Sequence, residues 1–149
     1  MYDKSLIISI FKNISWSLEQ ITKRFQHIQS SEDFLKDDTG LEKLDSICMQ
    51  LINIGEALKE IDKLTTGSIL ASYPDIDWKK AKGMRDIITH HYFDIDEETV
   101  FTVCKERIPE IKQTVQKMWS TDPLRPYQIF SPGSLYNEKG GNVHVKITD

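Results

Sequence analysis

An arginine, a histidine and a tyrosine occur at close spacing in one segment of this 149-residue chain. The segment runs from Gly83 to Asp94 and contains Arg85, His90 and Tyr92. A histidine can transfer protons near neutral pH, and an arginine can stabilise the charge that develops on phosphoryl oxygens. These side chains therefore suffice for chemistry on a phosphodiester without a metal ion.

The segment is predicted to be a helix that begins at Trp78, with Asp77 as its cap. At about 100° per residue, an apolar arc that should face the core separates from a polar arc that should face solvent. The apolar arc contains Ala81, Met84, Ile87, Ile88 and His91, and the polar arc contains Lys82, Arg85, Asp86, Thr89 and His90. We therefore expect His90 to be available to a ligand and His91 to be a partly buried structural residue.

The spacing also predicts how His90 is supported and limits how it meets Arg85. Asp86 lies four residues before His90, so its carboxylate can hydrogen-bond the imidazole and favour its protonated form. Arg85 and His90 lie about 140° apart around an ideal helix, so one straight helix does not direct both to one atom. Either the arginine reaches around the helix or the site uses two copies of the chain. A symmetric homodimer would gather two arginines and two histidines in one cleft.

Long amphipathic helices are predicted before and after this segment. The three-four spacing of apolar residues predicts helices over 4–29 and 41–63, and a last helix over 97–119. Pro109 falls inside the last helix and should kink it. The four helices should pack as a bundle, because each has one apolar face to bury.

Short elements are predicted between the first two long helices and before the motif helix. A helical turn with Phe34 and Leu35 should precede a break at 37–40, and a turn or short helix should occupy 65–77. Gly55 interrupts the second helix, where it either lets another helix approach closely or belongs to a site beside Glu56.

The composition is typical of a soluble globular protein. Hydrophobic residues make up 39% of the chain and charged residues 28%, and no apolar run approaches the ~20 residues of a membrane span. The N-terminus lacks the pattern of a cleavable leader, so a cytoplasmic location is expected. A net charge of −4 argues against a protein that wraps nucleic acid over its whole surface, while leaving room for a local basic pocket. Cys48 and Cys104 are interpreted as small core residues, and neither a metal nor a cofactor is predicted.

The composition changes after residue 119, where prolines and glycines become frequent. We predict a packed helical domain over 1–119 and an irregular tail over 120–149. Residues 142–148 alternate in the manner of a single strand, which needs a partner edge, so this segment either pairs with another chain or is disordered.

At the motif the chain resembles the HepT-like branch of the HEPN superfamily, the toxin partners of minimal nucleotidyltransferases. The branch motif is Arg, four residues, His, any residue and Tyr, which Arg85, His90 and Tyr92 meet, and the polar residue after the arginine is Asp86. The resemblance covers residues 5–119 through six further segments, which are Asp33-Phe34-Leu35, Ile54-Gly55-Glu56-Ala57, Tyr73-Pro74, Asp77-Trp78, Gly83-Met84-Arg85 and Ile108-Pro109. The tail is longer than the family leads us to expect.

The resemblance implies an all-α, HEPN-type up-and-down helical bundle that forms a homodimer through the motif face. It implies a metal-independent endoribonuclease toxin that cleaves tRNA or mRNA and leaves a cyclic phosphate and a free 5′-hydroxyl. His90 would act as general acid or base while the ribose 2′-hydroxyl attacks, and Arg85 would stabilise the phosphoryl charge. Tyr92 corresponds to the residue that a separate nucleotidyltransferase antitoxin modifies with AMP. Glu56, Lys82 and Thr89 are predicted to line the site.

Other functions remain open at this stage. The same groove could belong to a non-catalytic subunit that binds a nucleotide or docks a nucleotidyltransferase. A metal hydrolase that uses Asp94, Asp96 and Glu97 is a weak alternative, because these residues are typical of a helix cap. Nucleotidyltransferase activity in this chain is rejected. Gly67-Ser68 and Asp75-Ile76-Asp77 have the residue types of the nucleotidyltransferase motif, Gly-Ser followed by Asp-x-Asp, but the spacing between them is too short.

Overall fold

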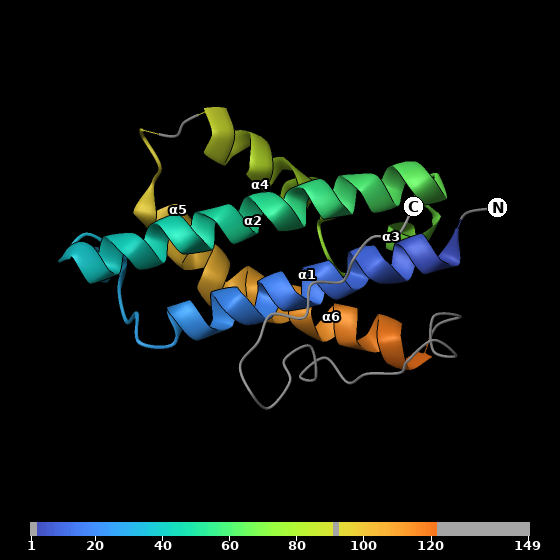
Figure 1. Cartoon of the computed structure of the whole chain (residues 1–149), viewed down its shortest axis with the longest axis horizontal. Helices are drawn as coiled ribbons and strands as arrows, with labels where there is room; N and C mark the ends of the chain where they lie inside the picture. The colour runs from blue at the N-terminus through green and yellow to red at the C-terminus, as the bar shows by residue number, and fades with distance from the viewer. Residues whose placement is uncertain (1–2, 91–92, 122–149) are drawn as a thin grey trace.

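Two long helices form one wall of the molecule. The structure is a computed structural model that describes residues 3–90 and 93–121. Helix α1, Lys4–Phe25, and helix α2, Asp38–Thr65, lie side by side and run in opposite directions (Figure 1). The predicted apolar stripe of α2 is buried in full, namely Leu44, Ile47, Cys48, Leu51, Ile54, Leu58 and Ile61. The contact between these helices is therefore an apolar one, as their spacing predicts.

The ends of both helices differ from the prediction. Helix α1 ends at Phe25 and not at residue 29, yet Ile28 remains in the core on the turn that follows. Helix α2 begins three residues earlier than predicted, because Asp37 caps it by accepting a hydrogen bond from the Gly40 backbone N–H at 2.7 Å. The predicted break at 37–40 therefore lies earlier, at residues 35–37, and residues 38–40 form the first turn of α2.

A short 3₁₀ turn, η1, spans Ser31–Phe34 and packs against the start of α2. Its Phe34 is fully buried, and the Asp33 carboxylate accepts hydrogen bonds from the backbone of residues 29 and 30. A Cβ on Gly40 would lie 2.2 Å from the Asp33 carbonyl oxygen. Glycine is therefore required at this position, where the turn crosses the helix.

The motif helix follows a short connecting element, as predicted. Helix α3, Ser68–Ala71, occupies part of the predicted turn, and α4 spans Trp78–His90. The Asp77 carboxylate accepts a hydrogen bond from the Lys80 backbone N–H at 3.1 Å. Trp78 is buried and donates its indole N–H to the Tyr73 carbonyl. These contacts fix the start of α4 and confirm the predicted cap.

The last helical region is made of three consecutive pieces. Helix α5 spans Glu97–Thr102, the π-helical segment η2 spans Val103–Arg107, and α6 spans Ile108–Thr121. The change of helix type comes just before Pro109, which has no N–H to donate to the carbonyl four residues earlier. The expected disturbance at this proline therefore takes the form of a π-helical segment.

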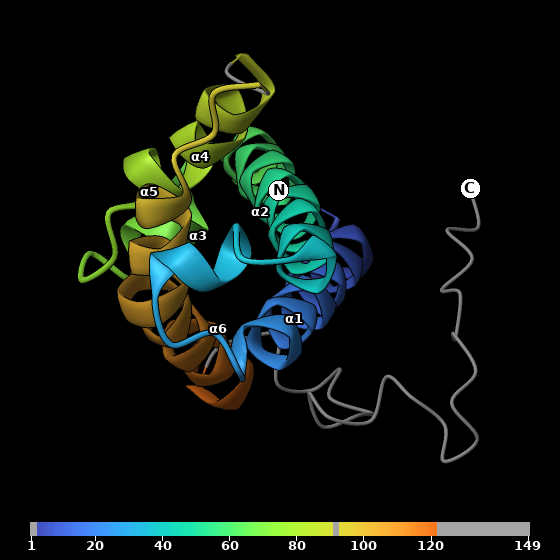
Figure 2. The same cartoon turned by 90° about the vertical axis from the view of Figure 1, so that its left-hand side faces the viewer.

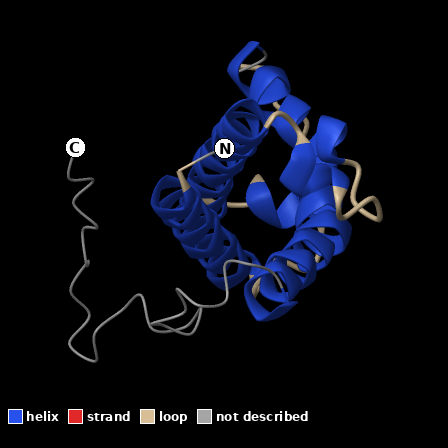
Figure 3. Ribbon diagram, turned by 90° about the vertical axis from the view of Figure 1, so that its right-hand side faces the viewer, coloured by secondary structure: helices blue, strands red, loops and turns tan. Residues whose placement is uncertain are grey.

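The elements together form an all-α up-and-down bundle. Helix α6 packs against α1, and α4 lies along the outer side of α2, as the end view shows (Figure 2). The part of the chain that the structure describes contains helices and loops and no strand (Figure 3). None of the helices in these residues is long and apolar enough to cross a membrane. The predicted strand at 142–148 lies outside the described residues.

Candidate functional site

Helix α4 packs tightly on α2 at Gly55. A Cβ built on Gly55 would lie 2.9 Å from Arg85 Cβ and 3.3 Å from the Lys82 carbonyl oxygen. A side chain here would therefore push the motif helix away from α2. The interpretation of Gly55 as a point of close helix approach is confirmed, and the approach places it directly beside the motif arginine.

The faces of α4 differ in part from the helical-wheel prediction. Ile88 is buried and Met84 is half-buried, as predicted, but Ile87 is 55% exposed. The predicted core arc was too wide, because among the described elements α4 packs mainly on α2 and its outer side meets solvent. Lys82 and Asp86, assigned to the solvent side, are half-buried and pair with side chains of α2.

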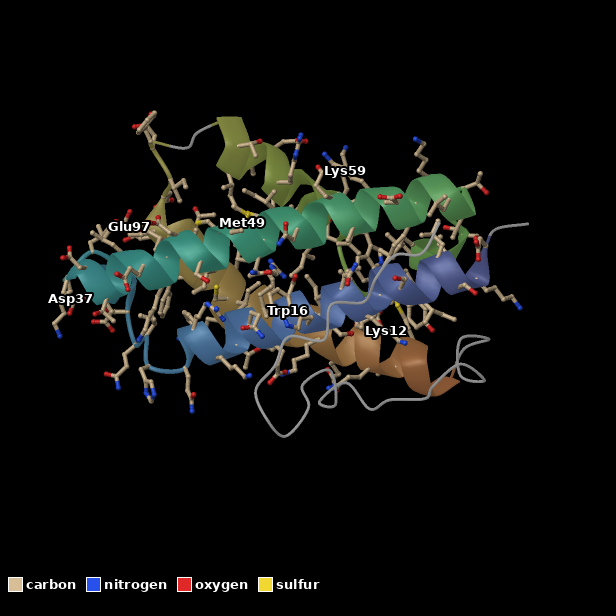
Figure 4. All side chains as sticks on the ribbon, viewed as in Figure 1. Lys12, Trp16, Asp37, Met49, Lys59 and Glu97 are labelled. Carbon is tan, nitrogen blue, oxygen red and sulfur yellow. The ribbon has the colours of Figure 1, made fainter. Side chains whose placement is uncertain are left out.

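Charged side chains connect the two helices along this contact. Lys82 pairs with Asp62, and Lys59 Nζ donates to both carboxylate oxygens of Asp86 at 3.1 and 3.2 Å. Figure 4 labels Lys59 on the part of α2 beside α4. Acidic and basic groups thus alternate across the contact and hold the polar edge of α4 against α2.

Arg85 lies at the centre of this network, between two carboxylates. Its Nη1 donates to Asp86 Oδ1 at 2.9 Å, and its Nε lies 2.7 Å from Glu56 Oε1. Despite this short distance, the Nε–H makes no hydrogen bond with the described residues, and the atom is shielded from solvent. The N–H therefore does not point at the Glu56 oxygen, so the contact is an ion pair without a directional hydrogen bond.

The network perturbs the titration of its central pair. The hydrogen bond to Asp86 and the charge of Glu56 raise the pKa of Arg85 above its ordinary value. The hydrogen bonds from Arg85 and Lys59 lower the pKa of the Asp86 carboxyl. Both groups are therefore held in their charged forms.

The structure places the predicted acid–base residue one turn beyond this network. His90 is the last residue of α4, one turn after Asp86, and its side chain lies outside the described part of the chain, as does all of Tyr92. The described contacts of Asp86 are to Arg85 and Lys59. The support of His90 by Asp86 therefore stays a prediction.

The remaining predicted site residues divide into two groups. Glu56 and Lys82 belong to the network beside Arg85. Thr89 is exposed and donates its hydroxyl to the Arg85 carbonyl oxygen at 2.9 Å. The ordinary role of this hydroxyl is thus a bond within its own helix.

The acidic residues after the motif cap a helix, as the sequence indicates. Asp96 accepts hydrogen bonds from the Glu98 backbone N–H at 3.1 Å and from the Thr99 hydroxyl at 2.6 Å. Within residues 3–90 and 93–121, no cluster of three histidine, cysteine or acidic side chains could hold a metal ion. The alternative of a metal hydrolase therefore gains no support here.

Sequence reasoning missed Lys59 and Asp62. With Glu56 they are spaced three residues apart on α2, which places acidic, basic and acidic groups along one side of the helix. That spacing was a usable signal. Their partners on α4 could not be inferred, because a sequence does not give the relative shift of two packed helices.

A cavity of about 280 Å³ lies on the other side of α4 from this network, beside Ala81 and Met84. Leu51 and Ile54 of α2 and Ile108 of α6 contribute to its apolar lining. Arg85 and Asp86 are not among its lining residues, so the cavity is separate from the motif network.

Comparison with known proteins connects these features to one family. The model of the family described as "Ribonuclease HepT-like" matches residues 14–118, which include the helices α2 and α4 and most of α1 and α6. No solved structure matches the chain.

Similar proteins carry ribonuclease names. Two proteins of Methanocaldococcus jannaschii named "Putative RNase" are each 42% identical over 71 residues, which is 48% of this chain and 56% and 54% of those proteins. The matched segment thus spans about half the length of these curated relatives. The "Probable ribonuclease HepT" of Thermococcus cleftensis is 32% identical over 87 residues, which is 58% of this chain and 73% of that protein. The chain belongs to the ribonuclease HepT-like family.

Proposed function

We propose that the protein is a metal-independent endoribonuclease in which Arg85 and His90 act on one phosphodiester. The observation that carries the proposal is the position of Arg85, fixed at the α2 contact by two carboxylates, one to two turns before His90 on the same helix. The family match and the names of the relatives support the class of reaction.

In the proposed reaction, the ribose 2′-hydroxyl attacks the adjacent phosphorus and the bond to the 5′-oxygen breaks. A histidine takes the proton of the 2′-hydroxyl, and an acid returns a proton to the leaving 5′-oxygen. Arg85 stabilises the charge on the non-bridging phosphoryl oxygens. The products are a 2′,3′-cyclic phosphate and a 5′-hydroxyl, and water enters only if the cyclic product is later hydrolysed.

The proposal includes a homodimer that contacts itself through α4. The outer side of this helix is free of described neighbours at Gly83, and Ile87 is 55% exposed. Met49 on α2 and Phe93 after α4 are also exposed apolar residues. Exposed apolar residues around one helix favour a protein contact there. Two copies meeting on this face would gather two arginines and two histidines in one cleft, so that Arg85 of one copy can act with His90 of the other.

A second function is supported by the charges around Arg85. Glu56 and Asp86 already balance the charges of Arg85 and Lys59 in the isolated chain. A non-catalytic subunit, in which the groove binds a nucleotide or docks a nucleotidyltransferase, would fit a site that is neutral overall. The two functions differ in whether the purified protein cuts RNA by itself.

The toxin role is a further part of the proposal. A separate minimal nucleotidyltransferase would act as antitoxin by transferring AMP to the Tyr92 hydroxyl, which would add bulk and negative charge to the motif. RNA, in the form of tRNA or mRNA, would be the substrate, and the 120–149 tail would lie outside the catalytic domain.

The test is incubation of purified wild-type and His90→Ala protein with total tRNA and a structured mRNA in EDTA. Product ends are then identified by mass spectrometry. The ribonuclease proposal expects cleavage by the wild type alone, with cyclic phosphate ends. An unmodified wild-type dimer that leaves RNA intact would favour the binding subunit instead.

A further inference from the structure

The two carboxylates that hold Arg85 are not equivalent. Asp86 accepts from Arg85 and from Lys59, and both of its oxygens take part. Glu56 contacts Arg85 alone among the described residues, and its side chain is 52% exposed. Asp86 is therefore fixed by two cations, whereas Glu56 is free to leave toward solvent.

The contact with Glu56 is also the weaker one in geometry. The Arg85 Nε–H is shielded from solvent and unsatisfied, although Glu56 Oε1 lies 2.7 Å from the nitrogen. A shielded donor without an acceptor costs free energy, which a better-aligned oxygen would recover. A phosphoryl group offers such oxygens and matches the planar fork of a guanidinium.

We propose that Glu56 is a built-in competitor for the substrate, which occupies Arg85 until an RNA phosphodiester displaces it. This inference rests on the proposed function, and it assigns a regulatory role within the same site. Displacement moves the Glu56 carboxylate into solvent and leaves Arg85 paired with Asp86, which Lys59 keeps in place. Arg85 thus stays beside α2 when its free donors turn to the phosphate.

The exchange would make Arg85 selective among anions. A small anion must replace Glu56 without further contacts, whereas an RNA strand adds contacts along its backbone. Glu56 therefore weakens the binding of every anion to Arg85, and ligands with several phosphates compensate for this loss through their other contacts. Removal of the Glu56 charge should therefore lower the dissociation constant for RNA.

The experiment measures binding of a 2′-O-methyl RNA oligonucleotide, which cannot be cleaved by 2′-hydroxyl attack. Dissociation constants are compared for full-length wild type, Glu56→Gln and Glu60→Gln at low and moderate salt. Glu60 lies four residues later on α2, is exposed and forms no ion pair among the described residues, so its variant controls for net charge. Each of the three proteins is also prepared with the additional substitution Arg85→Ala.

We expect Glu56→Gln to bind the oligonucleotide about three- to fivefold more tightly than the wild type, and Glu60→Gln to differ less than twofold. The gain should disappear in the Arg85→Ala background. Equal effects of the two glutamine variants, weaker binding by Glu56→Gln, or a gain that persists without Arg85 would overturn the competitor role.

A second readout follows the Arg85 Nε–H directly by NMR, with the signal assigned from its loss in Arg85→Lys. Addition of the oligonucleotide should shift this signal in the wild type, and an unchanged signal at saturation would overturn the proposal. Because the oligonucleotide is not cleaved, these results are independent of catalysis. If the protein binds the oligonucleotide as expected but does not cut natural RNA, the competitor role of Glu56 stands and the ribonuclease proposal fails.

Discussion

The contact between α1 and α2 differs in kind from the contact between α2 and α4. The first is formed by buried apolar side chains such as Phe11, Leu18 and Leu58. The second adds a glycine contact and a network of partly exposed ion pairs to the buried side chain of Ile88. Burial supplies most folding free energy, whereas exposed ion pairs supply little. The ion pairs at the polar edge of α4 can therefore exchange partners at little cost in stability, whereas the α1–α2 contact cannot loosen without loss of apolar burial.

Adjacent residues on α2 allow the two contacts to be broken separately. Leu58→Ala removes a fully buried side chain and should lower the free energy of unfolding by about 2–5 kcal/mol. Lys59→Gln removes the partner of Asp86 and should cost much less stability, while weakening RNA binding. Denaturant unfolding followed by circular dichroism measures the loss of stability in each variant. Equal losses of stability would contradict the distinction between the two contacts.

The two cysteines report whether the apolar side of the bundle opens. Burial raises the pKa of the Cys48 thiol to about 11 and that of Cys104 to about 12. Only thiolates react with disulfide reagents, so at pH 8 labelling should be at least about 100-fold slower than for an exposed thiol. Both should react promptly in denaturant. Fast labelling of the native protein would contradict the burial of these two thiols.

Two glycines provide a matched test of the α2–α4 contact. Gly55→Ala places a Cβ against Arg85 and should destabilise the protein by about 1–3 kcal/mol and reduce activity. Gly83→Ala points into open space on the motif helix and should stabilise the monomer by up to about 1 kcal/mol.

Thermal unfolding and RNA binding should be recorded for both variants. A stabilising Gly55→Ala change would show that α4 is not packed closely there. Loss of dimer in Gly83→Ala, without loss of stability, would place the glycine in the interface between copies.

The pH dependence of the network should appear at acidic values. The pKa of Asp86 is lowered from its ordinary value of 3.8, first by the hydrogen bond from Arg85 and then by that from Lys59. Its stabilising contribution is therefore fully present above pH 3.8 and is lost as the pH falls through the lower folded-state value. NMR titration of the Asp86 carboxyl carbon should give a midpoint below 3.8. A midpoint above this value would contradict the ion pairs.

Much of the fold could be predicted, because the apolar stripes of α1 and α2 are long and periodic. Element ends were less predictable, as Asp37 and Gly40 show, because turn residues also serve as caps and close contacts. The assignment of Ile87 to the core failed because an outer helix is covered on one side only. Lys59 was missed because its role depends on how α2 and α4 align.

The candidate site was predictable in its motif and not in its charge balance. Arg85 was singled out from residue type and spacing, and the structure places it beside Glu56. The restraint of Arg85 by carboxylates of two helices follows from packing, which the sequence pattern does not specify.

The central claim is that Arg85 and His90 act together on one phosphodiester. The most direct measurement is RNA cleavage in EDTA by Arg85→Ala protein, His90→Ala protein and mixed dimers obtained by co-expression of the two with different tags. The account predicts that each variant alone is inactive and that mixed dimers regain part of the activity and produce cyclic phosphate ends. The account would be contradicted if either variant alone cleaved RNA at the wild-type rate, or if the mixed dimers were as inactive as the two single variants.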